Sequence, residues 1–289
     1  MYCIYLCSKH KSSTKLFTYT LLGFNSPLEC WDVGNVKTFY RTFWDASSFN
    51  QDINTWDTKN VEDMSSVFVL ASSFNQDINT WNTEKVQDMS YMFRAATSFD
   101  LPINSWKVGK VRSMNYMFGV ESLEYDEDRL AISFNQPLDG WDVQQVTGMF
   151  AMFYYAEHFN QQLDDWNVGQ VFKMEYMFDG ALRFNQCLSS WALKTSDSVN
   201  TTSMLTKTGC PSCVDDKECY TPDPEVGPWC QDEGSFGCIA STSAPSTSPA
   251  PSSSPTPCSI KCPKRPVVYK DGSALYHLIA GCVYKEENC

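Results

Sequence analysis

Acidic side chains that recur at one spacing are the first candidates for chemistry in this chain. Asp139 and Asp164 lie 25 residues apart. If that interval is one turn of a stacked structure, their carboxyl groups would lie about 5 Å apart, the separation used by retaining glycoside hydrolases. A regular stack also creates such pairs without any catalytic role, so a glycoside hydrolase is an alternative that we do not favour.

Other reactive groups are few. Histidine occurs only three times, and no nucleophile elbow, phosphate-binding loop or H-E-x-x-H motif is present. Cys210 and Cys213 have the C-x-x-C spacing of zinc and redox sites, but no second such pair and no nearby histidine completes a zinc site. We therefore expect no enzyme activity, no cofactor and no metal centre of this kind.

An acidic insertion offers a different kind of site. Ten residues between Phe118 and Ala131 have no counterpart in the neighbouring units, and the acidic ones are Glu121, Glu124, Asp126, Glu127 and Asp128. Ca²⁺ prefers several oxygen ligands, but the D-x-D-x-D-G loop is absent. A contact loop and a tolerated insertion are the other interpretations.

All these residues belong to a repeat of about 25 residues. Seven units begin at Phe24, Phe49, Phe74, Phe99, Phe134, Phe159 and Phe184, and Trp, Val, Met, Phe and Ala follow in fixed order. Val61, Met64, Phe68 and Ala71 are spaced 3, 4 and 3, which predicts a helix in each unit. Residues 53–58 are too short for a second helix and predict a strand that pairs between units. Because such a unit cannot bury its apolar face alone, we predict an α/β fold, a right-handed solenoid of seven leucine-rich-repeat-like coils.

The repeat separates core positions from candidate ligand positions. The recurring Trp and Met residues are expected in the core, and the Asn after each leading Phe is expected to form a polar ladder between coils. The positions beside each Trp vary and are mostly acidic or polar. They form either a solvated face or a candidate ligand face, consisting of Asp57, Asn82, Lys107, Asp139, Asp142, Asp164 and Asn167.

Charge and cysteine content restrict the environment and the partners. A net charge of −12 argues against binding to nucleic acid or anionic membranes. Thirteen cysteines, clustered after residue 209, indicate an oxidising compartment, and their odd number leaves at least one thiol free or paired with another chain. We expect an extracellular or cell-surface location, with protein or glycan partners at a cell surface or matrix. No 18-residue apolar run is present, and no signal peptide is visible.

The composition changes along the chain and suggests five segments. Residues 1–23 are an N-terminal segment that we expect to be truncated or mis-assigned, and 24–205 form the repeat solenoid. Residues 206–239 form a disulfide cap with Cys210, Cys213, Cys219, Cys230 and Cys238, in which Cys210 is expected to pair with Cys230. Residues 240–257 are a Ser/Thr/Pro linker and 258–289 a second cysteine-containing segment. Asn200 begins the N-glycosylation sequon Asn200-Thr201-Thr202.

The repeat pattern resembles a known family. Residues 74–96 and 159–181 carry it nearly whole, as Phe-Asn-Gln, Ile or Leu, Trp, Val, Met, Met-Phe and Ala. In this it resembles the BspA-like leucine-rich-repeat surface proteins. The resemblance implies a surface-exposed repeat domain with a role in adhesion or protein binding, and no catalytic residues. We therefore expect a non-enzymatic recognition or adhesion protein, with a carbohydrate-binding module as the main alternative.

Overall fold

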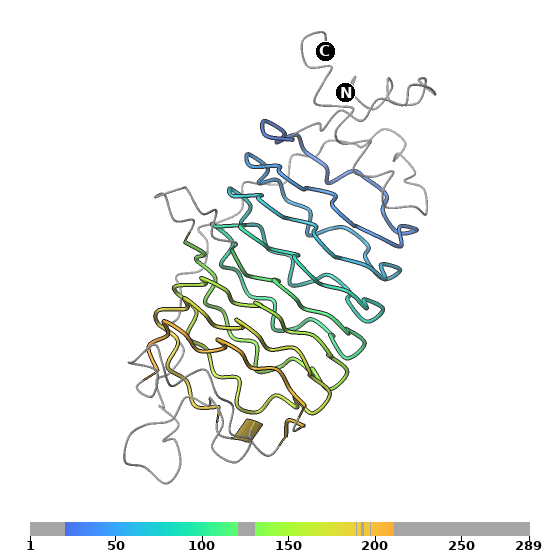
Figure 1. Cartoon of the computed structure of the whole chain (residues 1–289). Coiled ribbons are helices and arrows are strands. Elements are labelled where there is room, and N and C mark those ends of the chain that lie inside the picture. Colours follow the sequence, from blue (N-terminus) through green and yellow to red (C-terminus); the bar gives the residue numbers. More distant parts are fainter. Residues whose placement is uncertain (1–20, 121–130, 189, 192–193, 197, 211–289) are drawn as a thin grey trace, which may run out of the picture.

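The computed structural model describes residues 21–120, 131–188, 190–191, 194–196 and 198–210. In these ranges the chain winds through successive coils that lie side by side in one stack (Figure 1). We number the coils 1 to 7 by their leading phenylalanines, from Phe24 to Phe184. Within the described ranges there is no α-helix, and so none that could cross a membrane.

The main set of backbone hydrogen bonds that joins the coils runs in one direction. These bonds lie in a segment of each coil that we call the turn ribbon, residues 38–46, 63–71, 88–96, 113–120, 148–156, 173–181 and 200–208. At the junction of coils 2 and 3, alternate amides of coil 2 donate to carbonyls of coil 3, namely Met64 to Asp88 (3.0 Å), Ser66 to Ser90 (2.8 Å), Phe68 to Met92 (2.8 Å) and Leu70 to Arg94 (2.9 Å). The other junctions repeat this pattern within the turn ribbons, and a second set of bonds runs the other way, as from Gln87 N–H to Glu62 O at 2.8 Å and from Ser73 N–H to Ser47 O at 3.1 Å.

The helix predicted in each unit is not present in the described residues. Ser66 and Leu70 have φ of 60°, a left-handed conformation that no α-helix contains. The amides between the junction donors instead close local turns, such as Ala71 N–H to Phe68 O at 3.1 Å. A run of such turns repeats its inward positions at intervals of three and four, as a helix does, so the spacing did not distinguish the two.

The strand predicted at residues 53–58 is also absent. The chain turns there, with the Trp56 amide donating to Ile53 O at 3.1 Å. Parallel pairing occurs instead at single residues where each turn ribbon begins, linking Thr38, Asp63, Asp88, Ser113, Gly148, Lys173 and Asn200 in that order. The right-handed winding and the leucine-rich-repeat assignment stay predictions.

The recurring aromatic residues form the core, as predicted. Six Trp side chains are at most 4% exposed, and only Trp31 of coil 1 is partly buried. Each of the six donates its indole N–H to a carbonyl of the preceding coil, as Trp106 does to Ile78 O at 3.0 Å. Leading phenylalanines of adjacent coils stack, with Phe49 and Phe74 at a centroid separation of 5.9 Å. The Trp column is therefore part of the scaffold and presents no platform for a sugar.

The predicted asparagine ladder is also confirmed. The Oδ1 atom of Asn50 accepts the backbone N–H of Asn75 at 2.9 Å and the Nε2 group of Gln76 at 2.9 Å. Equivalent bonds link the neighbouring coils, with Asp100 taking the Asn role in coil 4. The amide column is thus used to satisfy turn backbone between coils.

Coil 7 extends beyond the boundary predicted at residue 205. Its turn ribbon accepts the Gly180 amide at Thr206 O (2.9 Å), and Cys210 is buried with its Sγ 3.4 Å from Phe184 O. The coil carries two additional residues, because Asn200 pairs with Lys173 at a separation of 27 in sequence. Polar Thr201 occupies the position of the buried methionine in this coil, so the repeat pattern is weaker here.

Candidate functional site

The predicted ligand face is exposed, but much of it is occupied by local structure. Asp57, Asn82, Asp142 and Asn167 each accept, through Oδ1, the backbone N–H two residues ahead, at distances from 3.0 to 3.4 Å. Such Asx turns are common in loops and fix a bend without any ligand. Lys107 lies in the same column, and its backbone is held by Thr83 Oγ1.

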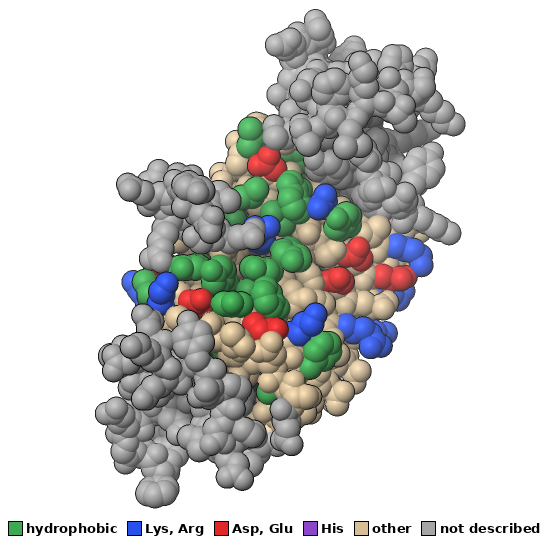
Figure 2. Space-filling model, in the orientation of Figure 1, with side chains coloured by type: hydrophobic (Ala, Val, Ile, Leu, Met, Phe, Trp, Pro, Cys, Tyr) green, Lys and Arg blue, Asp and Glu red, His purple; other side chains and the backbone are tan. Residues whose placement is uncertain are grey.

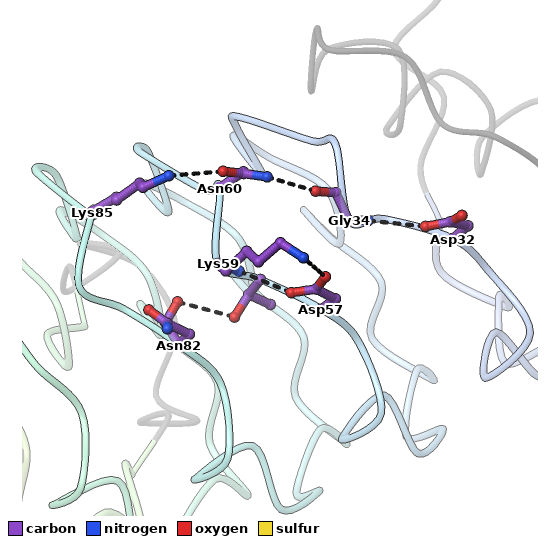
Figure 3. A network of polar contacts seen from close by, with 8 residues as sticks. Asp32, Gly34, Asp57, Lys59, Asn60, Asn82 and Lys85 are labelled. Carbon is purple, nitrogen blue, oxygen red and sulfur yellow. Dashed lines mark hydrogen bonds and ion pairs between the residues drawn. The ribbon is translucent and has the colours of Figure 1, made fainter.

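A polar network ties this column to its neighbours in coils 1 to 3 (Figure 3). Lys59 Nζ lies 2.7 Å from Asp57 Oδ2, and the hydrogen bond from this ammonium lowers the pKa of the Asp57 carboxyl. Lys85 donates to Asn60 Oδ1 at 2.8 Å, and Asn60 Nδ2 donates to Gly34 O at 2.8 Å. The Lys85–Asn60 and Asn60–Gly34 contacts connect one coil to the next, whereas the Lys59–Asp57 pair lies within coil 2.

The two carboxylates considered for catalysis make contacts of the same kind. Asp139 Oδ1 accepts from Asn104 Nδ2 at 2.9 Å, and Asp164 Oδ1 accepts the Ser190 amide at 3.0 Å. Each contact joins adjacent coils. The structure therefore gives both side chains a role in stacking, and the proposal of a catalytic pair gains no support from it.

The remaining predicted sites are only partly described. The contact-loop residues Glu121, Glu124, Asp126, Glu127 and Asp128 lie outside the described residues, as do Cys213, Cys219, Cys230 and Cys238. Cys210 is disulfide-bonded, as are Cys30 and Cys187. Asn200 is exposed, with its Nδ2 donating to Glu175 Oε1 at 2.8 Å. No cluster of three metal-binding side chains occurs in the part of the chain that the structure describes.

Aromatic side chains gather on the outer surface of the turn ribbons in coils 3 to 6. The inward positions of each ribbon are filled by buried Met, Phe and Ala, whereas the aromatic residues between them in coils 3 to 6 are half-buried or, at Tyr176, exposed. On the side of the stack that Figure 2 shows, hydrophobic side chains gather in the middle, with charged groups around and between them. We call the outer surface of the turn ribbons in coils 3 to 6 the aromatic face and define it as Tyr91, Arg94, Tyr116, Phe150, Tyr154, Tyr155 and Tyr176.

The rings of the aromatic face form a continuous row along the stack. Tyr91 and Tyr116 stack at a centroid separation of 5.2 Å, Tyr116 and Phe150 follow at 5.3 Å, and Phe150 and Tyr176 at 5.8 Å. Tyr154 meets Tyr116 and Tyr176 edge to face at 6.4 and 6.2 Å. One ring per coil at this spacing gives a continuous apolar strip across four coils.

Two glycines make room for this packing. A Cβ on Gly119 would lie 3.0 Å from Cδ1 of Tyr116 and 2.6 Å from Ala151 O. A Cβ on Gly180, which has φ of +77°, would lie 2.5 Å from Cδ1 of Tyr155. Side-chain atoms cannot approach a Cβ this closely, so each glycine lets a tyrosine ring lie against the backbone of the ribbon.

The face also carries a cation and a tyrosine with a perturbed hydroxyl. The Arg94 guanidinium lies over the Tyr91 and Tyr116 rings at 5.9 and 5.8 Å, within cation–π range. Burial, followed by the charges of Tyr155 and Asp179, raises the pKa of Tyr154 well above its usual range. Tyr154 therefore keeps its proton at all physiological pH values and can donate a hydrogen bond.

The aromatic face was not predicted from the sequence, because the candidate ligand positions were those that flank Trp. The signal was available as three tyrosines at one outward ribbon position, Tyr91, Tyr116 and Tyr176. That position has φ between 54° and 61° in these coils, a region that costs a non-glycine residue about 1–2 kcal/mol. The same position has a positive φ in the other coils, at Arg41, Ser66, Ala151 and Ser203, so this conformation belongs to the ribbon and is not particular to the tyrosines.

The chain matches a known family over most of its length. The family is DUF285, described as a Mycoplasma protein of unknown function, and it matches residues 11–129 and 128–210. The chain belongs to the DUF285 family. No curated protein and no solved structure matches the chain.

The two DUF285 matches meet at residues 128 and 129, inside the acidic insertion. The stack continues across this point, because Met114 of coil 4 donates to Gly148 O of coil 5 at 2.9 Å. The aromatic face also crosses it, since Tyr116 precedes the insertion and Phe150 follows it. The two DUF285 segments therefore share one continuous outer surface.

Proposed function

We propose that this DUF285 protein is a non-enzymatic recognition or adhesion protein of the cell surface or extracellular space, similar in role to BspA-like surface proteins. The observation that carries the proposal is the aromatic face. Tyr, Phe and Arg are enriched in the centres of protein interfaces, and on this face Tyr176 is exposed while the other rings are half-buried. Disulfide-bonded Cys30, Cys187 and Cys210 support an oxidising location.

The arrangement of the rings favours a protein partner over a glycan. A sugar stacks on the free flat face of an aromatic ring, whereas Tyr116 and Tyr154 pack face to edge against their neighbours. A protein side chain can instead use ring edges, the Arg94 guanidinium and the tyrosine hydroxyls together. A carbohydrate-binding module remains the second candidate, because Tyr176 is 37% exposed and could present one ring face.

Binding by matched surface variants tests the proposal. Tyr176→Ser removes an exposed ring from the aromatic face, and Asn82→Ser removes a side chain from the originally predicted ligand face. We expect the full-length Tyr176→Ser protein to lose at least about tenfold in affinity for partner cells or matrix, as for other aromatic anchors. Asn82→Ser should bind like the parent protein.

The opposite pattern would assign binding to the columns beside Trp and reject the aromatic face. A glycan array with the same two variants distinguishes the second candidate. Sugar binding that Tyr176→Ser abolishes would replace the protein-partner proposal with the carbohydrate module.

A further inference from the structure

Phe172 of coil 6 is an exposed aromatic residue in a column that is otherwise polar. The same position of coils 1 to 5 carries Lys37, Glu62, Gln87, Arg112 and Thr147. Phe172 is 47% exposed and belongs neither to the core nor to the aromatic face. Among the described residues no other ring contacts it, and Lys173 Nζ lies 5.8 Å from its centroid. Packing within the stack therefore does not explain an apolar side chain at this position.

The N-glycosylation sequon of coil 7 lies directly beside this residue. The Asn200 backbone amide donates to Phe172 O at 3.0 Å, and Asn200 forms the parallel bridge with Lys173. Asn200 is exposed, and its Nδ2 donates to Glu175 Oε1 at 2.8 Å. Thr202 holds the amide from the other side, because its Oγ1 donates to Asn200 Oδ1 at 2.8 Å. The nitrogen that accepts a glycan thus lies against the coil that carries Phe172.

We propose that Asn200 carries an N-linked glycan and that Phe172 is the ring on which the first sugars of this glycan pack. The proposal rests on the extracellular location proposed above, because the glycan is added in the secretory pathway. One face of a pyranose consists mainly of C–H groups, and such a face packs against an aromatic ring. Adjacent coils are about 4.8 Å apart, a distance that the first sugars of a glycan span.

The chemistry of the transfer is compatible with the contacts of Asn200. Nδ2 attacks C1 of an oligosaccharide linked to a polyprenyl diphosphate, which is the co-reactant of this step. The Nδ2–C1 bond forms, the C1–O bond to the diphosphate breaks, and the polyprenyl diphosphate leaves. One Nδ2 proton passes to a base of the transferase. The other proton stays on Nδ2, so the modified amide can still donate to Glu175 Oε1.

The competing explanation is that Phe172 extends the surface that binds a protein partner. An exposed ring beside a cation suits such a role as well. The sequon distinguishes the two, because Asn-x-Ser/Thr, with x other than Pro, occurs once in the sequence and lies on the coil adjacent to the exposed ring. Only the glycan explanation makes the effect of Phe172 depend on modification of Asn200.

Secretion of the full-length protein from a eukaryotic host with an added signal sequence tests the modification. We expect peptide mapping to find Asn200 glycosylated, and the Asn200→Gln protein to lack the glycan. An unoccupied Asn200 would overturn the proposal. Because the added signal imposes secretion, that result would count against the glycan and not against the extracellular location or the aromatic face.

A thermal unfolding cycle tests the role of Phe172. The parent and the Phe172→Thr protein, which carries the residue of coil 5, are each prepared with the glycan from the eukaryotic host. Each is also prepared without it from a bacterial periplasm, which is oxidising. We expect the glycan to raise the unfolding midpoint of the parent by about 2–4 °C and that of Phe172→Thr by less than about 1 °C. Equal shifts in the two proteins would overturn the contact and leave the ring to a protein partner.

Discussion

The indole hydrogen bonds between coils should make a measurable contribution to stability, and Trp106→Phe tests this. Trp106 is 1% exposed and donates to Ile78 O at 3.0 Å. Loss of that bond costs about 1 kcal/mol, because the same carbonyl keeps a second donor, the Trp81 amide. The smaller ring leaves a cavity that costs about 1–2 kcal/mol more. We expect a total loss of about 2–3 kcal/mol.

Trp31→Phe is the matched control. Trp31 heads the same column in coil 1, is only partly buried, and its indole N–H has no acceptor among the described residues. Its replacement should cost less than about 1 kcal/mol. The assay is denaturant unfolding of the disulfide-intact protein, with free energies from linear extrapolation. Equal losses for the two variants would refute the assigned role of the indole hydrogen bond.

Three further predictions concern other parts of the stack. Asp100→Asn restores the ladder residue of the other coils, so its unfolding free energy should stay within about 0.5 kcal/mol of the parent; a larger loss would show that the ladder needs a carboxylate there. Leu70→Gly relieves a φ of 60° and should be neutral or stabilising by up to about 1 kcal/mol, whereas Leu182→Gly, at an exposed leucine without positive φ, should destabilise; the same sign for both in thermal unfolding would contradict this. Because the folded protein raises the pKa of Tyr154, stability should be intact below pH about 10 and fall above it, and Tyr154→Phe should reduce that fall in alkaline unfolding curves.

The sequence was sufficient to predict the period, the core and the ladder. Trp, Met and Phe recur in register because each must meet its copies in neighbouring coils, so burial follows from the period alone. The Asn column could be predicted for a similar reason, since a polar residue that recurs at a turn must satisfy the backbone of the next turn. Trp106 and Asn75 both occupy the positions that this reasoning gives them.

The local conformation could not be predicted in the same way. Spacings of three and four describe inward positions in both an α-helix and a ribbon of turns, and the choice depends on where the amides find acceptors. The Ser66 backbone amide donates to a carbonyl of the next coil. That acceptor exists only when the coils are stacked, so it cannot be recognised in the sequence of a single unit. Tyr91 and Tyr116 adopt a left-handed backbone conformation although neither is glycine, so the sequence gives no sign of that conformation.

The candidate site was missed for a related reason. The residues in the columns around Asp57 and Asn82 differ between coils, and this variation was interpreted as a sign that these positions bind a ligand. The structure instead uses their side-chain oxygens to fix Asx turns. The outward ribbon positions became recognisable only when the ribbon geometry showed that Tyr116 and Phe150, 34 residues apart across the insertion, are in ring contact.

Site-specific photo-crosslinking tests the central claim, that the aromatic face is the recognition surface. A photoreactive phenylalanine analogue would replace Tyr176 in one protein and Asp57 in another, and each would be presented to the intact cell surface or matrix before illumination. We predict a defined covalent adduct from position 176 and none from position 57. Adducts from position 57 alone would contradict the account and return the binding site to the columns beside Trp.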